Sequence, residues 1–162
     1  MAVALCTAVL GAGAGYAEDE ARISQLTRID SDYLQRQRDA VDSLARLQLG
    51  RQIHGERGND IDVLQGLLDR QAVAADDRAT LQGMGIVLGD LLAKELDMHW
   101  VIYEDKLGRS RALRYGDSDL FLYPVTMISR RVEAGAEADV QAIFDKAVSL
   151  MRPHLPTRPF QY

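Results

Sequence analysis

Five residues in the second half of the chain have side chains suited to binding a ligand: Trp100, Arg111, Arg114, Arg130 and Arg131. Guanidinium groups bind carboxylates and phosphates through paired hydrogen bonds, and they stack on aromatic rings. We expect Trp100 to face Arg114 across a β-hairpin, where an exposed stack of this kind contributes about 0.5–1 kcal/mol. These residues therefore form the candidate site for an unknown protein partner or a small anionic ligand.

The alternative is that the arginines only form ion pairs on the surface, each of which contributes little to stability. The acidic residues available for such pairs are Glu104, Asp117, Asp119 and Glu133. The sequence leaves both interpretations open.

Catalysis has weaker support than binding. Glu104 and Asp105 are adjacent, and neighbours in a strand point to opposite faces, so they are poor candidates for two carboxylates acting on one substrate. The rival hypothesis is a hydrolase-like enzyme that uses one of these carboxylates together with His99. No serine lies in a G-x-S-x-G motif, which weakens hydrolase chemistry without excluding a triad assembled in space.

Metal and cofactor binding have no signature in the sequence. The three histidines, His54, His99 and His154, have no second ligand at helical or hairpin spacing. The single cysteine is Cys6, in a segment that we expect to be removed. We predict no metal site, no cofactor and no catalytic cysteine.

The composition is that of an ordinary globular protein. The 162 residues are 47% hydrophobic and 27% charged, and one domain of this length buries about 68–70% of its unfolded surface. The 19 basic and 24 acidic residues give a net charge of −5. This balance argues against a general nucleic-acid binder, which needs a basic face to displace counterions.

The first 17 residues resemble a secretory signal peptide. They carry no charge, contain a short apolar core, and place Gly15 and Ala17 at the −3 and −1 positions of a cut after Ala17. The apolar core is shorter than the ~20 residues that a membrane span needs. We therefore expect export to the periplasm and a single domain over residues 18–162, with no transmembrane segment in the mature chain.

Hydrophobic periodicity predicts helices before and after a strand-rich segment. The expected helices begin at Ser31, near Asp60, at Asp76 or Asp77, at Pro124 and near Glu137. The expected strands are 98–104, 110–115 and 120–123, which form a three-stranded antiparallel meander, while 18–27 is expected to be a polar lead-in. The fold class is thus predicted as α+β.

Three glycines, Gly83, Gly85 and Gly89, interrupt the third helix, where each costs about 1 kcal/mol relative to alanine. Helices keep such residues where another backbone must approach closely. Phosphate binding is the alternative, but the G-x-G-x-x-x-G spacing matches neither a dinucleotide fingerprint nor a P-loop, and no strand precedes it. We predict close packing.

The hairpin register is predicted from its turn. If Asp105 pairs with Arg109, then Trp100 faces Arg114 and Ile102 faces Ala112. A slip of one residue would exchange the faces of one strand.

Four motifs in this region resemble a bacterial family catalogued as a domain of unknown function. They are G-x-x-L-G (85–89), W-V-I-Y-E-D (100–105), G-R-x-x-A-L-R (108–114) and P-V-T-M-I-S-R-R-V-E (124–133). The resemblance is best over residues 81–151. It implies a small α+β domain and carries no activity or catalytic residues. Our hypothesis is a periplasmic binding or partner-interaction protein, of which an immunity protein against an incoming toxin is one form, and an enzyme is less expected.

Overall fold

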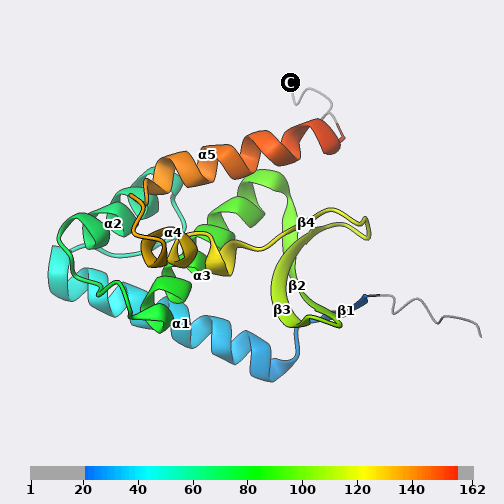
Figure 1. Cartoon of the computed structure of the whole chain (residues 1–162), viewed down its shortest axis with the longest axis horizontal. Coiled ribbons are helices and arrows are strands. Elements are labelled where there is room, and N and C mark those ends of the chain that lie inside the picture. The colour runs from blue at the N-terminus through cyan, green and yellow to red at the C-terminus, as the bar shows by residue number, and fades with distance from the viewer. Residues whose placement is uncertain (1–20, 157–162) are drawn as a thin grey trace, which may run out of the picture.

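The computed structural model describes residues 21–156 and shows an α+β fold in which a sheet lies at one end of a helical body (Figure 1). The predicted fold class is confirmed. The helices are α1 (Arg28–Leu49), α2 (Arg57–Asp69), α3 (Arg78–Leu96), α4 (Ser129–Glu133) and α5 (Val140–Met151), with 3-10 turns η1 (Pro124–Thr126) and η2 (Arg152–His154). The strands are β1 (Arg22–Gln25), β2 (Met98–Asp105), β3 (Gly108–Tyr115) and β4 (Phe121–Leu122). The predicted leader, residues 1–17 with the cut after Ala17, lies outside the described residues.

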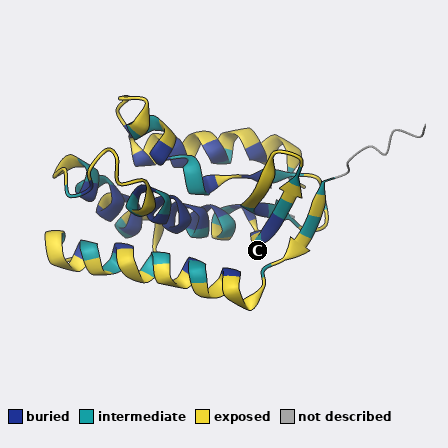
Figure 2. Ribbon diagram, turned by 60° about the horizontal axis from the view of Figure 1, so that its bottom comes forward, coloured by how far each residue is buried: buried dark blue, intermediate teal, exposed yellow. Residues whose placement is uncertain are grey.

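The buried centre of the molecule is α3. Most of its residues from Leu81 to Leu92 are buried, and Figure 2 shows it as the dark blue helix between partly exposed neighbours. None of the helices within residues 21–156 is long and apolar enough to cross a membrane. Side chains from α1, α2 and α5 meet those of α3 in one apolar core, where Phe144 is 1% exposed.

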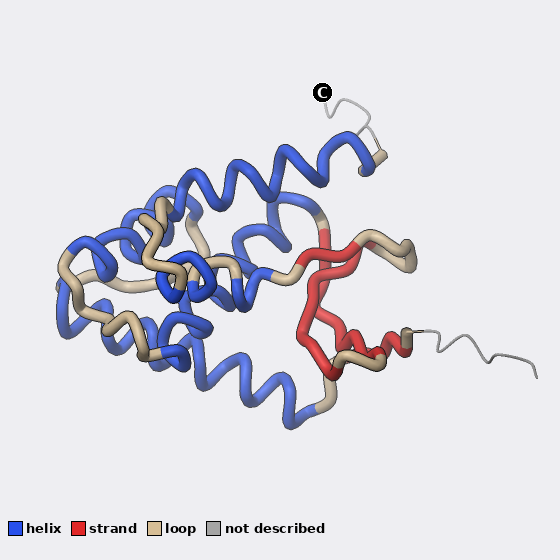
Figure 3. The backbone as a smooth tube through the Cα atoms, viewed as in Figure 1, coloured by secondary structure: helices blue, strands red, loops and turns tan. Residues whose placement is uncertain are grey.

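The sheet has four antiparallel strands in the order β1-β2-β3-β4, one more than predicted (Figure 3). The additional strand is β1, which pairs with β2 from Arg22 opposite Glu104 to Gln25 opposite Val101. Its sequence, R-I-S-Q, contains one apolar residue, so periodicity does not predict a strand there. The strand forms through backbone pairing along the edge of β2 rather than through burial of its side chains.

The predicted hairpin register is wrong by one residue. Asp105 pairs with Gly108, so Trp100 lies opposite Leu113 and Arg114 lies opposite His99. The loop is two residues long because the Asp105 carboxylate accepts a hydrogen bond of 2.8 Å from the Leu107 backbone amide, and Gly108 has a φ of +131°. As a result Trp100 and Arg114 project from opposite faces of the sheet.

The N-terminus of α1 differs from the prediction. The N-cap is Thr27 rather than Ser31, and Thr27 forms a capping box with Asp30. The Thr27 hydroxyl accepts a hydrogen bond from the Asp30 amide, and the Asp30 carboxylate accepts one from the Thr27 amide. Asp30 is buried at 2% exposure, so this cap fixes a carboxylate inside the protein.

Other helix boundaries shift by a few residues. Of the two predicted caps of α3, Asp76 and Asp77, the structure has Asp77. By contrast, α2 begins after Glu56 instead of near Asp60, and α5 is capped by Asp139 instead of starting near Glu137. The helix predicted from Pro124 is divided into η1 and α4.

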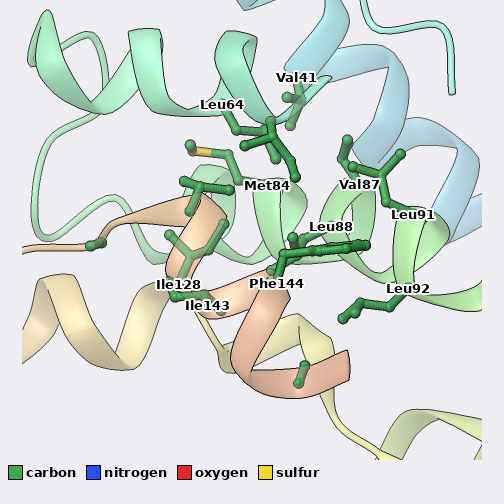
Figure 4. Close-up of a cluster of buried hydrophobic side chains, with 14 of the residues drawn as sticks. Val41, Leu64, Met84, Val87, Leu88, Leu91, Leu92, Ile128, Ile143 and Phe144 are labelled. Carbon is green, nitrogen blue, oxygen red and sulfur yellow. The ribbon is translucent and has the colours of Figure 1, made fainter. Parts of the chain in front are cut away.

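The glycines of α3 allow close packing, as predicted. A Cβ atom added to Gly85 would lie 2.4 Å from the Val125 carbonyl oxygen. A Cβ atom on Gly89 would lie 2.5 Å from the Trp100 ring and 2.8 Å from Pro124. The backbone of η1 and the indole of β2 therefore rest directly on the helix. Figure 4 shows the adjoining core, in which Met84 and Leu88 of α3 approach Ile128 and Phe144.

Candidate binding site

Trp100 packs β2 onto α3 instead of facing the arginines. Its indole Nε1 donates a hydrogen bond of 2.9 Å to Oδ1 of Asp90. Asp90 also accepts two hydrogen bonds from the Arg38 guanidinium, at 2.6 and 2.8 Å. The half-buried indole thus has a structural role, joining β2, α3 and α1.

Arg111 and its neighbour Arg109 bind the buried carboxylate of Asp30. Arg109 Nη2 donates to Asp30 Oδ2 at 2.7 Å, and Arg111 Nη2 donates to Asp30 Oδ1 at 3.0 Å. The hydrogen bond from Arg109 is the main cause that holds the pKa of Asp30 well below its usual range, with further hydrogen bonds from Thr27. The Arg111 guanidinium also lies 4.1 Å from the ring centre of Tyr33. These contacts fasten β3 to the first turns of α1.

Arg114 braces the turn between β3 and β4. Its Nε donates to the Ser118 carbonyl oxygen at 2.7 Å, and its Nη2 donates to the Asp117 carbonyl oxygen at 2.6 Å. The guanidinium lies 5.7 Å from the centre of the Phe121 ring. The cation–aromatic contact predicted for Arg114 is therefore made with Phe121 and not with Trp100.

Arg130 and Arg131 lie on α4 beside a hollow of about 410 Å³. Its other cation is Lys146 of α5. We call this hollow the α4–α5 groove, and its lining consists of Phe121, Leu122, Tyr123, Thr126, Met127, Arg130, Arg131, Ile143, Lys146, Ala147 and Leu150. The floor is apolar, Leu150 is 59% exposed, and the described residues contribute no carboxylate to the lining. The groove therefore combines an apolar surface with three positive charges.

A second hollow of about 580 Å³ lies between β3 and η1, and we call it the β3-edge groove. Its lining residues are Tyr103, Asp105, Leu107, Gly108, Arg109, Ser110, Arg111, Tyr123, Val125, Thr126 and Arg130. It shares Tyr123, Thr126 and Arg130 with the α4–α5 groove. The two hollows are thus neighbours that meet at Arg130.

The five predicted site residues fall into separate groups. Arg130 and Arg131 lie together, and Arg111 joins Arg130 in the β3-edge groove, whereas Trp100 and Arg114 line neither groove. Sequence reasoning missed Lys146, Arg109 and Asp30. The T-x-x-D spacing of a capping box marks Asp30 locally, but no local signal connects it to arginines 79 and 81 residues away.

The residues of the rival enzyme hypothesis do not converge. His99 lies on β2 with both carboxylates, five positions from Glu104 and six from Asp105, which corresponds to roughly 16–20 Å of strand. Asp105 lines the β3-edge groove and His99 does not. Across residues 21–156, moreover, no three His, Cys, Asp or Glu side chains are grouped so that they could hold a metal ion.

Comparison with known proteins identifies a family and a similar fold. A family model described as "Domain of unknown function (DUF3806)" matches residues 60–144, which include the whole β3-edge groove. A crystal structure from Bacteroides thetaiotaomicron VPI-5482, at 1.50 Å resolution, superposes with a TM-score of 0.73 and 17% sequence identity. The alignment covers 80% of this chain and 48% of that chain, so this chain spans about half the length of the other, and the likeness concerns the fold alone. No significant match was found among curated proteins.

Proposed function

This chain belongs to the family of the Domain of unknown function DUF3806, and we propose that it is a binding protein that holds an anionic ligand or partner in the α4–α5 groove. The observation that carries this proposal is the grouping of Arg130, Arg131 and Lys146 around an apolar floor that has no carboxylate in its described lining. Such a surface suits a group that has a negative charge next to an apolar body.

The cations of the groove differ in their pairing from the arginines of β3 and from Arg78 of α3. Arg109 and Arg111 are bound to Asp30, and Arg78 is bound to Glu133 at 2.9 Å. Within residues 21–156, Arg130, Arg131 and Lys146 form no salt bridge with an acidic side chain. Their charges are therefore available to an external anion, and each charge-assisted hydrogen bond to it contributes about 1.5–3 kcal/mol.

The apolar floor favours an anion that also carries an apolar group. Ile143 and Ala147 of α5 are buried beneath it, and Leu150 extends the same face into solvent. Burial of an alkyl chain on this floor contributes about 0.8 kcal/mol per methylene group. A fully hydrated inorganic anion would not use this part of the groove.

Titration of the ¹⁵N-labelled protein with octanoate and with its neutral analogue octanamide tests this proposal. We expect octanoate to shift the amide signals of α4 and α5, and octanamide to bind at least about tenfold more weakly because it lacks the charge. Combined substitution Arg130→Ala, Arg131→Ala and Lys146→Ala should lower octanoate affinity about a hundredfold. The matched control is Arg36→Ala, an exposed arginine of α1 away from both grooves. Equal octanoate binding by the triple variant and the wild type would place the site elsewhere.

We also propose that the protein acts in the periplasm. The support is the uncharged segment 1–17, with small residues at the −3 and −1 positions before Glu18. The intact mass of protein recovered from the periplasmic fraction of expressing bacteria should correspond to a chain that begins at Glu18. Uncleaved protein found only in the cytoplasmic fraction would contradict this proposal.

A further inference from the structure

One edge of β3 is only partly covered by β4. The strand β3 runs from Gly108 to Tyr115, but β4 pairs only with Leu113 and Arg114. Over 108–112, no strand among residues 21–156 lies on the side opposite β2. The β3-edge groove lies along this uncovered portion.

The backbone groups that face this groove follow from the alternation of an antiparallel ladder. The Tyr115 amide donates a hydrogen bond of 3.2 Å to the Leu120 carbonyl oxygen, on the β4 side. Every second residue of β3 faces the same way, so the amide and carbonyl groups of Arg109 and Arg111 point towards the groove. Unpaired groups in such a row are a template for another strand.

The chain cannot continue β4 along this edge. After Leu122 it turns into η1 at Pro124, which has no backbone N–H to donate. The carbonyl groups of Pro124 and Val125 rest against Gly85 of α3, which fixes the position of η1 beside β3. Tyr123, Val125 and Thr126 form the wall of the groove opposite Arg109 and Arg111.

The charged side chains of this edge do not cover its backbone. Lysine and arginine side chains commonly block an exposed edge, but here the guanidinium groups of Arg109 and Arg111 are held by Asp30 of α1. Both guanidinium groups therefore lie on the helix-facing side of the sheet. The backbone edge between them is left accessible from the groove.

We propose that β3 accepts an extended acidic segment of a partner protein as an added strand, which continues the line of β4. The acidic character follows from charge complementarity. Arg109 and Arg111 share the single negative charge of Asp30, and Arg130 adds a positive charge against the one carboxylate of the lining, Asp105, so the groove keeps a positive excess. A second copy of this chain is the less suitable occupant, since it would place the same arginines opposite one another. Arg130 lines both grooves. An acidic residue of the added strand that binds Arg130 therefore places the next residues of that strand at the apolar floor of the α4–α5 groove. This inference rests on the proposed function, whose partner class it specifies.

A display library of random linear dodecapeptides, selected on the full-length protein, tests this inference. We expect enriched peptides to be acidic and to shift the ¹⁵N amide signals of Arg109 and Arg111 when added as synthetic peptides. In an added strand, every second peptide amide donates to β3. N-methylation of those amides should weaken binding at least about tenfold, and N-methylation of the intervening amides should leave it nearly unchanged. Arg130→Ala should lower peptide affinity about tenfold, whereas Arg36→Ala should have no effect.

The outcomes separate this inference from the proposed function. Absence of enriched peptides, or enriched peptides that leave the Arg109 and Arg111 amides unshifted, would overturn strand addition even if octanoate binds in the α4–α5 groove. Peptides that shift these two amides and show the alternating effect of methylation would support strand addition even if octanoate does not bind. Equal weakening by N-methylation of either set of amides would show that the peptide is not paired as a strand.

Discussion

Asp30 Oδ2 lies 2.7 Å from Arg109 Nη2 and joins the first turn of α1 to β3 across 79 residues of sequence. The Asp30 side chain is 2% exposed, whereas the Arg109 side chain is 41% exposed. The acceptor carboxylate of this ion pair is thus buried, whereas the guanidinium donors remain partly exposed to water. It fixes the helix-facing side of the same strand whose backbone edge lines the β3-edge groove.

Replacement Asp30→Ala should destabilise the protein by about 2–4 kcal/mol. It removes the capping acceptor and leaves two guanidinium groups unpaired, and the partial exposure of these groups keeps the loss towards the lower part of the range for broken buried pairs. Urea unfolding followed by circular dichroism measures the difference. The matched control is Asp32→Ala, in the same turn but exposed, which should change stability by less than about 0.5 kcal/mol. An equal effect of the two substitutions would remove the special role of Asp30.

The contribution of Asp30 should disappear in acid. Its pKa is lowered in the folded protein from an ordinary value of 3.8, chiefly by Arg109. A lowered pKa of a carboxyl group adds stability above the unfolded pKa and loses it as the pH falls towards the folded value. The stability difference between wild type and Asp30→Asn should therefore be constant from pH 7 to pH 5 and become smaller below about pH 4. Urea unfolding at pH 7, 5 and 3 measures it, and a difference that grows in acid would contradict the assignment.

Replacement Gly89→Ala should destabilise the protein by about 2 kcal/mol, although alanine is the better helix former. The added methyl group would lie 2.5 Å from the Trp100 ring, which is itself bound to Asp90. Unfolding should be followed by tryptophan fluorescence, because Trp100 is the only tryptophan and directly reports the displaced ring. At Gly58 of α2, an added Cβ meets only ordinary contacts at 3.5 Å and beyond, so Gly58→Ala should be neutral or slightly stabilising.

Replacement Trp100→Phe should affect stability and not binding. The loss of the hydrogen bond to the Asp90 carboxylate should cost about 1–2 kcal/mol. Trp100 lines neither groove, so the dissociation constant for octanoate should change by less than about twofold. Calorimetric unfolding and an octanoate titration of the same sample measure both quantities. A large loss of octanoate affinity in a folded variant would show that Trp100 takes part in ligand binding.

The sequence predicted those parts of the fold that depend on local patterns. The cap at Asp77, the strand at 98–104 and the glycines of α3 follow from side-chain preferences and periodicity within a short window. The strand β1 was missed because its only apolar residue is Ile23 and its pairing depends on a backbone about 80 residues away.

The relative positions of the candidate site residues could be predicted only in part, because they depend on the register of the hairpin. The loop between Asp105 and Gly108 is one residue shorter than predicted, so Arg114 does not lie opposite Trp100. Lys146 of α5 lines the α4–α5 groove. Its position could not be predicted, because no local motif connects α5 to α4. Arg130 and Arg131 stayed together because they are neighbours on one short helix.

The contact between Gly85 and the carbonyl groups of η1 has a consequence for ligand entry. Without a side chain between them, the wall that carries Val125 and Thr126 rests on the most buried helix of the protein. That wall cannot move inwards to adapt to a guest, and moving outwards would expose the core. Both grooves are therefore preorganised on this side, so a bound group loses little free energy to ordering the wall, and its affinity reflects how well it matches a fixed shape.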